Sequence, residues 1–147
     1  MDDLLNQMLQ AFANNFTFYL KSHNYHWSVA GPDFVQYHKF LEEIYDDAQD
    51  NIDTYAEKIR QIGAYPEGDY RDIVKNTQLM DPVDTVKDPM IIFANLMDDI
   101  DVIVTQLQGV YDIAGTYKEY GIQNFLADRI DAHRQQAWMI QNILGGE

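Results

Sequence analysis

Apolar residues recur every three or four positions over four long stretches of the chain, the spacing that gathers them on one face of an α-helix. These stretches cover residues 3–29, 32–62, 88–117 and 123–144. No stretch shows the alternation of apolar and polar positions that is typical of a half-buried strand. We therefore predict an all-α fold in which residues 1–147 form a single domain.

Glycine and proline mark where these helices begin and end. Gly31 and Pro32 separate the first pair, because glycine favours the left-handed C-cap of a helix and proline suits the first turn of the next. So short a break predicts an antiparallel helical hairpin. Gly63 is expected to end the second helix, and Asp88 followed by Pro89 has the form of an N-cap at the start of the third.

The segment between the second and third helices, residues 63–87, is long for a connection within a compact domain. The simplest explanation is that it runs the full length of the bundle, with a short helix over residues 69–75. Gly121 marks a short turn before the last helix. Short, long and short connections between four helices match a ferritin-like four-helix bundle with one long crossover connection that carries a short helix.

The composition excludes several classes of protein. With 147 residues and 46% hydrophobic content, the chain can bury a core of its own. It contains no cysteine, so neither disulfides nor thiolate metal sites are available. The acidic N-terminus lacks the features of a signal peptide, and no apolar run approaches the roughly 20 residues that span a bilayer. We therefore expect a soluble cytoplasmic protein without membrane contacts.

The formal net charge is −14, with only ten lysine and arginine residues. Nucleic-acid affinity depends largely on such residues neutralising phosphates, so direct DNA binding is not expected. The same negative field attracts cations and raises their local concentration. The alternative is that the acidity only keeps the protein in solution.

The candidate chemistry lies between residues 26 and 57. His26 and His38 are twelve residues apart, Glu42 follows one helical turn later, and Asp53 and Glu57 are themselves one turn apart. Nitrogen and oxygen ligands without thiolate suit iron, manganese or zinc. On a helical wheel, a set of polar residues falls on an arc well away from the apolar face of its helix, so it faces outward from a lone bundle. This outer stripe consists of His38, Glu42, Asp46, Gln49, Asp53 and Glu57.

The outward direction of the stripe separates two kinds of iron site. Common di-iron bundles carry Glu-x-x-His motifs that face inward, and this chain contains no such motif. An outer stripe can bind metal if a second subunit covers it, as in a two-fold homodimer. The alternative is a solvated acidic face. On the apolar face of the first helix, His26 is then an ordinary interface histidine, and His23 and Trp27 belong to the core. We assign no role to His133.

Two segments of the chain resemble the signatures of one protein family. HWSVAGPDFVQYHKF resembles the first signature of the Dps miniferritins, the family named for DNA protection during starvation, and DTYAEKIRQIGAYP resembles the second. Together the two segments span residues 26–66 in register and without gaps. AWMIQNIL near the C-terminus resembles the last helix of that family.

This resemblance implies a hollow dodecameric shell with ferroxidase centres across two-fold subunit contacts. It implies that His26 and His38 of one subunit bind non-haem iron together with Asp53 and Glu57 of its partner. Glu42 stands where the family usually has Asp, as a ligand to a second iron. Trp27 matches a tryptophan that takes up oxidising equivalents. Peroxide or dioxygen then oxidises Fe(II), and ferric oxide collects inside the shell, which protects against oxidative damage.

The chain departs from the family at two places. It has no lysine-rich terminal tail of the kind that binds DNA in many members. Near the start of the last helix, where the family's iron-entry pore is usually lined by Asp, it has Tyr120 and Asn124, with Glu119 and Asp128 as replacements. Two alternatives to a ferroxidase stay open: a DNA-protecting or structural shell with little oxidase activity, and a bundle that binds another divalent metal.

Overall fold

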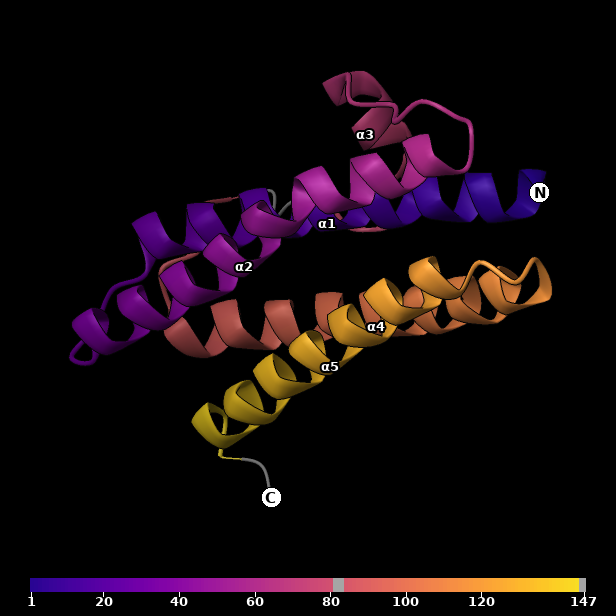
Figure 1. The fold of residues 1–147 in the computed structure, drawn as a ribbon. Coiled ribbons are helices and arrows are strands. Elements are labelled where there is room, and N and C mark those ends of the chain that lie inside the picture. The colour runs from indigo at the N-terminus through magenta and orange to yellow at the C-terminus, as the bar shows by residue number, and fades with distance from the viewer. Residues whose placement is uncertain (81–83, 146–147) are drawn as a thin grey trace.

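Long helices dominate the computed structural model, which describes residues 1–80 and 84–145 (Figure 1). The described residues contain no strand, so the predicted all-α class is confirmed. The helices are α1 (Asp2–Ser28), α2 (Phe34–Gln61), α3 (Tyr70–Asn76), α4 (Pro89–Thr116) and α5 (Tyr120–Ile143).

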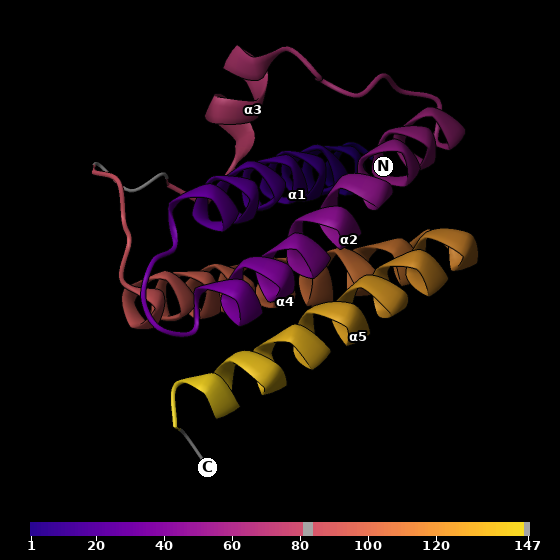
Figure 2. The same ribbon diagram turned by 90° about the vertical axis from the view of Figure 1, so that its left-hand side faces the viewer.

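The four long helices form two antiparallel hairpins that pack against each other. The first hairpin is α1 with α2, and the second is α4 with α5 (Figures 1 and 2). The crossover leaves the end of α2, passes outside α1 with α3 projecting from it, and reaches α4 at the opposite end of the bundle (Figure 2). This path confirms the prediction that the long connection travels the length of the bundle.

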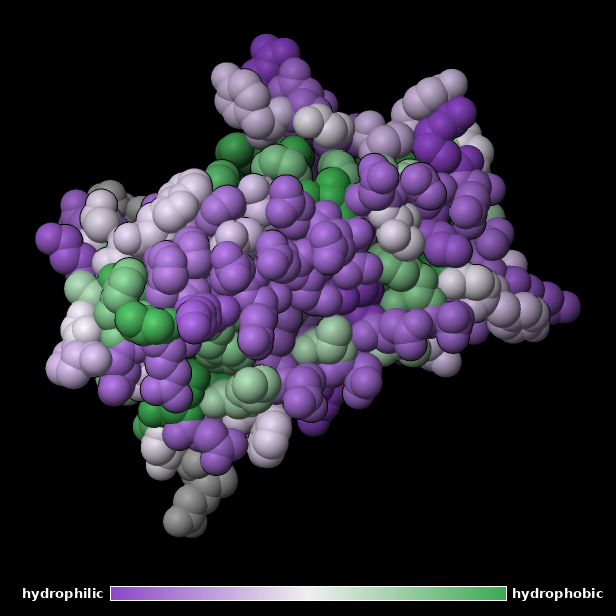
Figure 3. Space-filling model, turned by 60° about the vertical axis from the view of Figure 1, so that its left-hand side comes forward, coloured by the Kyte–Doolittle hydropathy of each residue, from purple (hydrophilic) through white to green (hydrophobic). Residues whose placement is uncertain are grey.

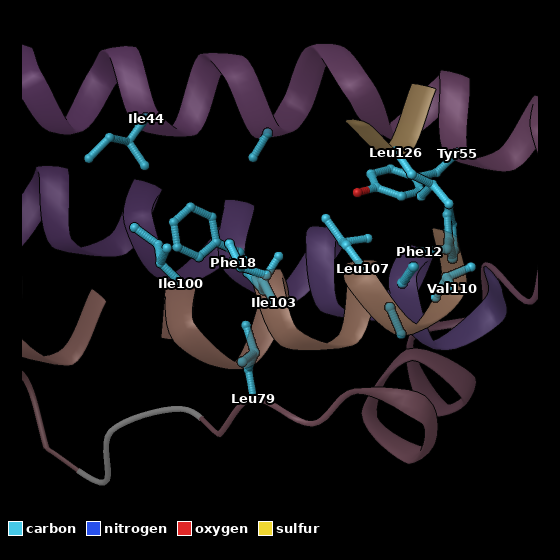
Figure 4. Packing of buried hydrophobic residues seen from close by; sticks show 14 of the residues in the cluster. Phe12, Phe18, Ile44, Tyr55, Leu79, Ile100, Ile103, Leu107, Val110 and Leu126 are labelled. Atoms are coloured by element: carbon cyan, nitrogen blue, oxygen red, sulfur yellow. The ribbon is translucent and has the colours of Figure 1, made fainter. Parts of the chain in front are cut away.

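The core lies where the apolar faces of the four long helices meet. Phe18 from α1, Ile44 and Tyr55 from α2, and Ile103 and Leu107 from α4 are each at most 2% exposed (Figure 4). Fully burying a side chain of this size contributes about 1.5–3 kcal/mol each. The predicted apolar faces therefore supply the main attraction between the hairpins.

Polar side chains of α1 attach the crossover to the bundle. The Asn14 side-chain oxygen accepts hydrogen bonds from the Gln78 backbone N–H at 2.7 Å and from the Thr77 hydroxyl at 3.1 Å. The Asn14 amide donates to the side-chain oxygen of Gln78 at 2.9 Å. Beside them, the buried Leu79 points into the core (Figure 4). A side chain with two donors and an acceptor thus satisfies a backbone that pairs with no strand or helix.

A buried ion pair holds the next residue of the crossover, Met80. The Lys21 ammonium donates to the backbone carbonyl of Met80 at 2.6 Å and pairs with the Asp99 carboxylate at 2.7 Å. Lys21 and Asp99 are both buried, so the charges stabilise each other where water cannot. One cation therefore joins α1, the crossover and α4.

Several helix ends follow the sequence prediction. Gly63 has φ +88°, and the Ala64 N–H donates to the carbonyl of Ile59 at 3.3 Å, which is the Schellman C-cap that glycine favours. At the start of α4, the Asp88 carboxylate accepts from the Met90 N–H at 2.9 Å, with Pro89 as the first helical residue. Local chemistry determines both of these ends.

The connection between α1 and α2 differs from the prediction. Gly31 is not the C-cap, because α1 already ends at Ser28 and Val29 is extended, with φ −56° and ψ 140°. The Ala30 N–H leaves the helix to donate to the carbonyl of Lys87 at 3.0 Å. Gly31, at φ +126°, instead makes the turn before α2 begins at Phe34, two residues later than predicted.

The connection between α4 and α5 also differs. Gly121 lies inside α5, which begins at Tyr120. The turn is made by Lys118, at φ +59°, and the Glu119 N–H donates to the carbonyl of Ala114 at 2.9 Å. A lysine thus adopts the left-handed conformation that glycine takes at the end of α2.

Candidate metal centre

His26 and His38 lie face to face where the last turn of α1 meets the beginning of α2. Their ring centroids are 3.6 Å apart and the ring planes differ by 16°. His26 Nδ1 is 2.7 Å from the backbone carbonyl of His38, and His38 Nδ1 is 2.7 Å from the backbone carbonyl of His26. A carbonyl oxygen only accepts, so each Nδ1 carries its proton and donates it across the pair.

This reciprocal pairing sets the chemistry of both rings. With Nδ1 protonated, each neutral imidazole keeps its lone pair on Nε2, which is the nitrogen free to bind a metal. The carbonyl of His26 can accept because the usual helical donor, the Ala30 N–H, is bonded to Lys87. The unexpected end of α1 therefore prepares the histidine pair.

A third ring extends the stack. Phe34, the first residue of α2, packs on His38 with ring centroids 4.8 Å apart and ring planes 28° from parallel. His26 is only 8% exposed, and its ring is held between α1 and α2. The orientation of both histidines is thus fixed by packing as well as by hydrogen bonds.

Glu42 follows His38 by one turn of α2 and is exposed. The Tyr45 hydroxyl lies 3.4 Å from its carboxylate oxygen. Burial, followed by the nearby charges of Glu42 and Asp46, raises the pKa of Tyr45, so its phenol stays protonated and can donate. Glu42 is therefore an exposed carboxylate whose neighbour Tyr45 packs near His26.

Aromatic rings surround this pair on the side of α1. His23 lies between two rings. Its centroid is 3.9 Å from that of Tyr45, with the ring planes 10° apart, and 4.2 Å from that of Trp27, with the planes 36° apart. The Tyr19 hydroxyl is 3.2 Å from His23 Nδ1. Burial lowers the pKa of His23, the neighbouring His26 lowers it further, and Asp46 opposes both effects. His23 is thus a half-buried neutral ring in an aromatic cluster.

The alternative in which Trp27 belongs to the core is wrong. It is 62% exposed, because the last turn of α1 carries its indole to the outside of the bundle. It contacts His23, which in turn contacts His26 at a centroid distance of 6.0 Å. Trp27 therefore lies beside the histidine pair, one ring removed from it.

Asp53 and Glu57 lie one turn apart on the exposed face of α2. They are far from the histidines, because fifteen residues of helix separate His38 from Asp53 by about 22 Å. Within the described residues, no three histidine, aspartate or glutamate side chains gather closely enough to hold a metal ion. One chain thus brings His26 and His38 together and places Asp53 and Glu57 elsewhere along α2.

The outward direction of the stripe is confirmed. All its carboxylate and amide members are exposed, and His38 is half-buried at its end. Hydrophilic side chains cover much of the side of the molecule on which α2 lies (Figure 3). The exposed residues of the stripe are Glu42, Asp46, Gln49, Asp53 and Glu57.

A guanidinium occupies the interior of the bundle between α2 and α5. Arg129, 4% exposed, donates to both carboxylate oxygens of Asp47, at 3.1 and 2.6 Å. His133 Nε2 lies 3.5 Å from the same guanidinium, and its Nδ1 donates to the Gln136 side-chain oxygen at 3.0 Å. Because the Arg129 guanidinium already neutralises Asp47, this interior is unsuited to a metal cation. This agrees with the absence of a Glu-x-x-His motif from the sequence.

His133, to which we assigned no role from its sequence position, belongs to this interior network. Burial, and then the charge of Arg129, lower its pKa from 6.5 to about 4. In the same region, burial raises the pKa of Tyr55 to about 12, although Arg129 opposes the shift. The only local sign of His133 was its spacing on α5, four residues from Arg129 and three from Gln136.

In the two ranges that the structure describes, no helix is both long and apolar enough to cross a membrane. The residues near the start of α5 that were considered for iron entry, Tyr120, Asn124 and Asp128, are exposed at four-residue intervals. Their role stays a prediction.

Comparisons with known proteins agree with this architecture. Residues 3–146 match the family described as ferritin-like domain. A DNA protection during starvation protein from Brevibacillus brevis is 29% identical over 142 residues, which are 96% of this chain and 92% of that protein.

Two solved structures superpose closely on the chain. The Dps protein of Vibrio cholerae, described as a member of a broad superfamily of ferritin-like diiron-carboxylate proteins, has a TM-score of 0.92 and 28% identity, covering 97% of this chain and 89% of its own. Dps from Staphylococcus aureus has a TM-score of 0.94 and 26% identity, and the match covers 100% of this chain and 98% of that protein's chain.

Proposed function

Because the chain belongs to the ferritin-like family, and within it to the Dps-type miniferritins, we propose that it is an iron-storing ferroxidase. It oxidises Fe(II) with peroxide or dioxygen at sites shared between two subunits. The ferric product collects as oxide inside a hollow homo-oligomeric shell, dodecameric by the family resemblance. Iron is the substrate and the stored cargo.

The observation that carries this proposal is the reciprocal pairing of His26 and His38. It presents two Nε2 lone pairs from neutral rings whose orientation is fixed before any metal binds. Imidazole nitrogens with carboxylate oxygens suit iron, and anionic ligands favour Fe(III) over Fe(II), so bound iron is easier to oxidise.

The spacing of the outer stripe supports a shared site. When two copies of α2 lie antiparallel across a two-fold axis near the middle of the stripe, His38 faces the partner's Glu57. Glu42 then faces the partner's Asp53, so each histidine pair receives the carboxylates that its own chain places about 22 Å away. A two-fold axis produces two such sites, because the same patch contributes on both subunits.

In the proposed reaction, His26 and His38 hold Fe(II) from one subunit, and Asp53 and Glu57 of the partner supply negative charge. Glu42 binds a second iron or bridges to it, oriented by Tyr45. Two Fe(II) ions give two electrons to peroxide, which breaks its O–O bond without releasing a hydroxyl radical. The net charge of −14 draws further cations to the shell.

The decisive experiment mixes two inactive variants. One combines His26→Ala with His38→Ala, the other Asp53→Ala with Glu57→Ala, and each alone is expected to slow peroxide-driven ferric formation by about 100-fold. When the two are co-assembled in equal amounts, half of the dimers are mixed, and each mixed dimer holds one intact site. About a quarter of the sites, and of the wild-type rate, should therefore return.

Asp50→Ala, an exposed carboxylate of α2 outside the stripe, serves as the matched control and should keep the wild-type rate. Light scattering before the assay establishes that every variant assembles. A mixture no faster than its parents would contradict the shared site, and undiminished oxidation by the doubly substituted histidine variant would contradict the ligand assignment itself.

A further inference from the structure

Tyr19 and His23 form a phenol–imidazole pair that the proposed iron site does not use as a ligand. The two residues are one turn apart on α1, and the phenol oxygen lies 3.2 Å from Nδ1. We propose that Tyr19 is a redox-active residue that gives one electron to the centre when a single Fe(II) meets peroxide, while its proton passes to His23. This inference rests on the proposed ferroxidase function.

Ring contacts connect Tyr19 to the histidine pair. Tyr45 contacts His26 with ring centroids 5.1 Å apart, and Tyr19 contacts Tyr45 at 6.4 Å. His23 forms a second route, because its ring centroid is 5.6 Å from that of Tyr19 and 6.0 Å from that of His26. Tyr19 is therefore one aromatic ring away from a proposed iron ligand along either route.

The phenol has a proton acceptor already in place. We assign Tyr19 as the donor of its hydrogen bond, with the imidazole proton of His23 on Nε2 and the lone pair on Nδ1. A phenol that loses an electron becomes a strong acid, so oxidation moves its proton along this bond. The result is a neutral phenoxyl group and a protonated imidazole, with no charge left on the phenol.

The electrons and atoms of the step balance. Peroxide needs two electrons to break its O–O bond, and it leaves as two hydroxide ions. One Fe(II) supplies one electron and becomes Fe(III). Tyr19 supplies the second and becomes the phenoxyl radical, and its proton rests on His23. Without such a donor, the same single Fe(II) would split peroxide into one hydroxide ion and one hydroxyl radical.

The surroundings favour Tyr19 over its aromatic neighbours as the final electron donor. The Tyr45 hydroxyl is directed at Glu42, a proposed iron ligand, at 3.4 Å. Trp27 packs against His23 and is 62% exposed in the single chain. Tyr19 is half-buried, and Phe16 packs edge-on against it at 6.0 Å, which shields the ring.

Electron paramagnetic resonance tests the proposal directly. The assembled protein receives one Fe(II) per site without oxygen, is mixed with hydrogen peroxide and is frozen within milliseconds. We expect a tyrosyl radical in the wild type, and a loss of at least about fivefold in signal in Tyr19→Phe. Tyr65→Phe removes an exposed tyrosine of the crossover and should leave the signal unchanged.

Placing 3-fluorotyrosine at position 19 gives a readout that a merely structural role would not move. The radical should then carry a fluorine hyperfine splitting, whereas the same substitution at position 65 should add none. A radical without that splitting, a tryptophan radical, or an undiminished signal in Tyr19→Phe would overturn the proposal.

Ferric absorbance recorded on the same samples separates this inference from the proposed function. Normal ferric formation without a radical on Tyr19 defeats the inference alone. If the wild type forms no ferric iron with peroxide, the ferroxidase proposal fails, and the role of Tyr19 fails with it.

Discussion

His26 and His38 illustrate what a sequence can reveal about single residues. Their types and their spacing were enough to propose two nitrogen ligands, with His38 on an outward face. The stacking of the rings and the exchange of Nδ1 protons for backbone carbonyls were not predictable. Both depend on the path of residues 29–33, which is set by a contact between Ala30 and the distant Lys87.

Other residues were misread for a similar reason. The alternative that placed Trp27 in the core rested on its position on the apolar face of α1, but its side chain is 62% exposed. Trp138, on the expected apolar face of α5, is 60% exposed. Periodicity gives the direction of a side chain but does not say whether another helix lies opposite.

The interior histidine predicts an acid-sensitive fold. His133 stays neutral in the folded protein, with a pKa of about 4, but has a pKa of 6.5 when unfolded. Below pH 6.5 the unfolded chain therefore binds a proton that the folded chain excludes, and stability falls until the pH reaches about 4. The shift in the pKa of His133 corresponds to a loss of about 3 kcal/mol in the free energy of unfolding across this pH range.

Thermal unfolding at pH 7 and at pH 4.5 measures this effect. The drop in Tm between the two pH values should be smaller for His133→Gln than for the wild type, because glutamine does not titrate. Comparing the drops, rather than the Tm values, removes the fixed cost of the substitution. Equal drops in the two proteins would show that His133 does not contribute.

At the scale of helices, the ends set by local chemistry were predictable and those set by tertiary contacts were not. Gly63 and the Asp88–Pro89 pair were recognised because each carries its own capping chemistry. Gly31 was predicted as a C-cap, but α1 ends before it, where the Ala30 N–H bonds to Lys87. Gly121 was predicted as a turn, but it lies inside α5.

The turn after α4 offers a stability prediction. Lys118 holds φ +59°, a conformation that costs an ordinary residue about 1–2 kcal/mol and costs glycine almost nothing. Lys118→Gly should raise the free energy of unfolding by up to about 1 kcal/mol, after the greater freedom of glycine in the unfolded chain is subtracted.

Gly63→Ala is the matched opposite, because Gly63 occupies the corresponding position after α2 at φ +88° with no side-chain clash to confuse the result. It should lower stability by about 1 kcal/mol. Chemical denaturation of both variants measures the two changes, and shifts of the same sign would refute the conformational explanation.

The proposed pairing of two α2 helices gives a second prediction at this scale. In that register Asp46 faces the partner's Gln49, an amide that can donate to a carboxylate. Gln49→Glu places two carboxylates opposite each other on both sides of the axis and should weaken dimerisation by about tenfold at low salt, because like charges face each other.

Gln49→Ala is the control, since it removes the amide without adding charge and should have a smaller effect. Sedimentation or light scattering over a range of protein concentration measures both variants. If Gln49→Glu assembles as tightly as the wild type at low salt, the antiparallel register is wrong.

At the scale of the whole molecule, the helix count, the long crossover and the all-α class followed from the pattern of apolar residues. The complete metal site that we propose did not, because a second copy would supply part of it. The outward direction of the stripe indicated that a second subunit could cover it. The family resemblance then assigned Asp53 and Glu57 to that partner.

The net charge of −14 makes a prediction for the assembled protein. Direct DNA binding should be absent, although relatives carry the name DNA protection during starvation protein, because the surface repels phosphate. A gel-shift assay at low salt, without divalent cations that could bridge the two, is the most permissive test. Strong retardation under those conditions would reveal a basic surface that the composition hides.

The stacked imidazoles bear on the order of events during iron capture. Because the contacts that orient both rings, including the one between Ala30 and Lys87, lie within one chain, a subunit holds both imidazoles in place before it meets any neighbour. These side chains lose their conformational freedom when the subunit folds, not when iron binds. In the proposed site, a newly made chain could therefore bind Fe(II) before it associates with a partner. Iron binding and subunit association would then favour each other, so the metal would stabilise the subunit contact as well as being stored.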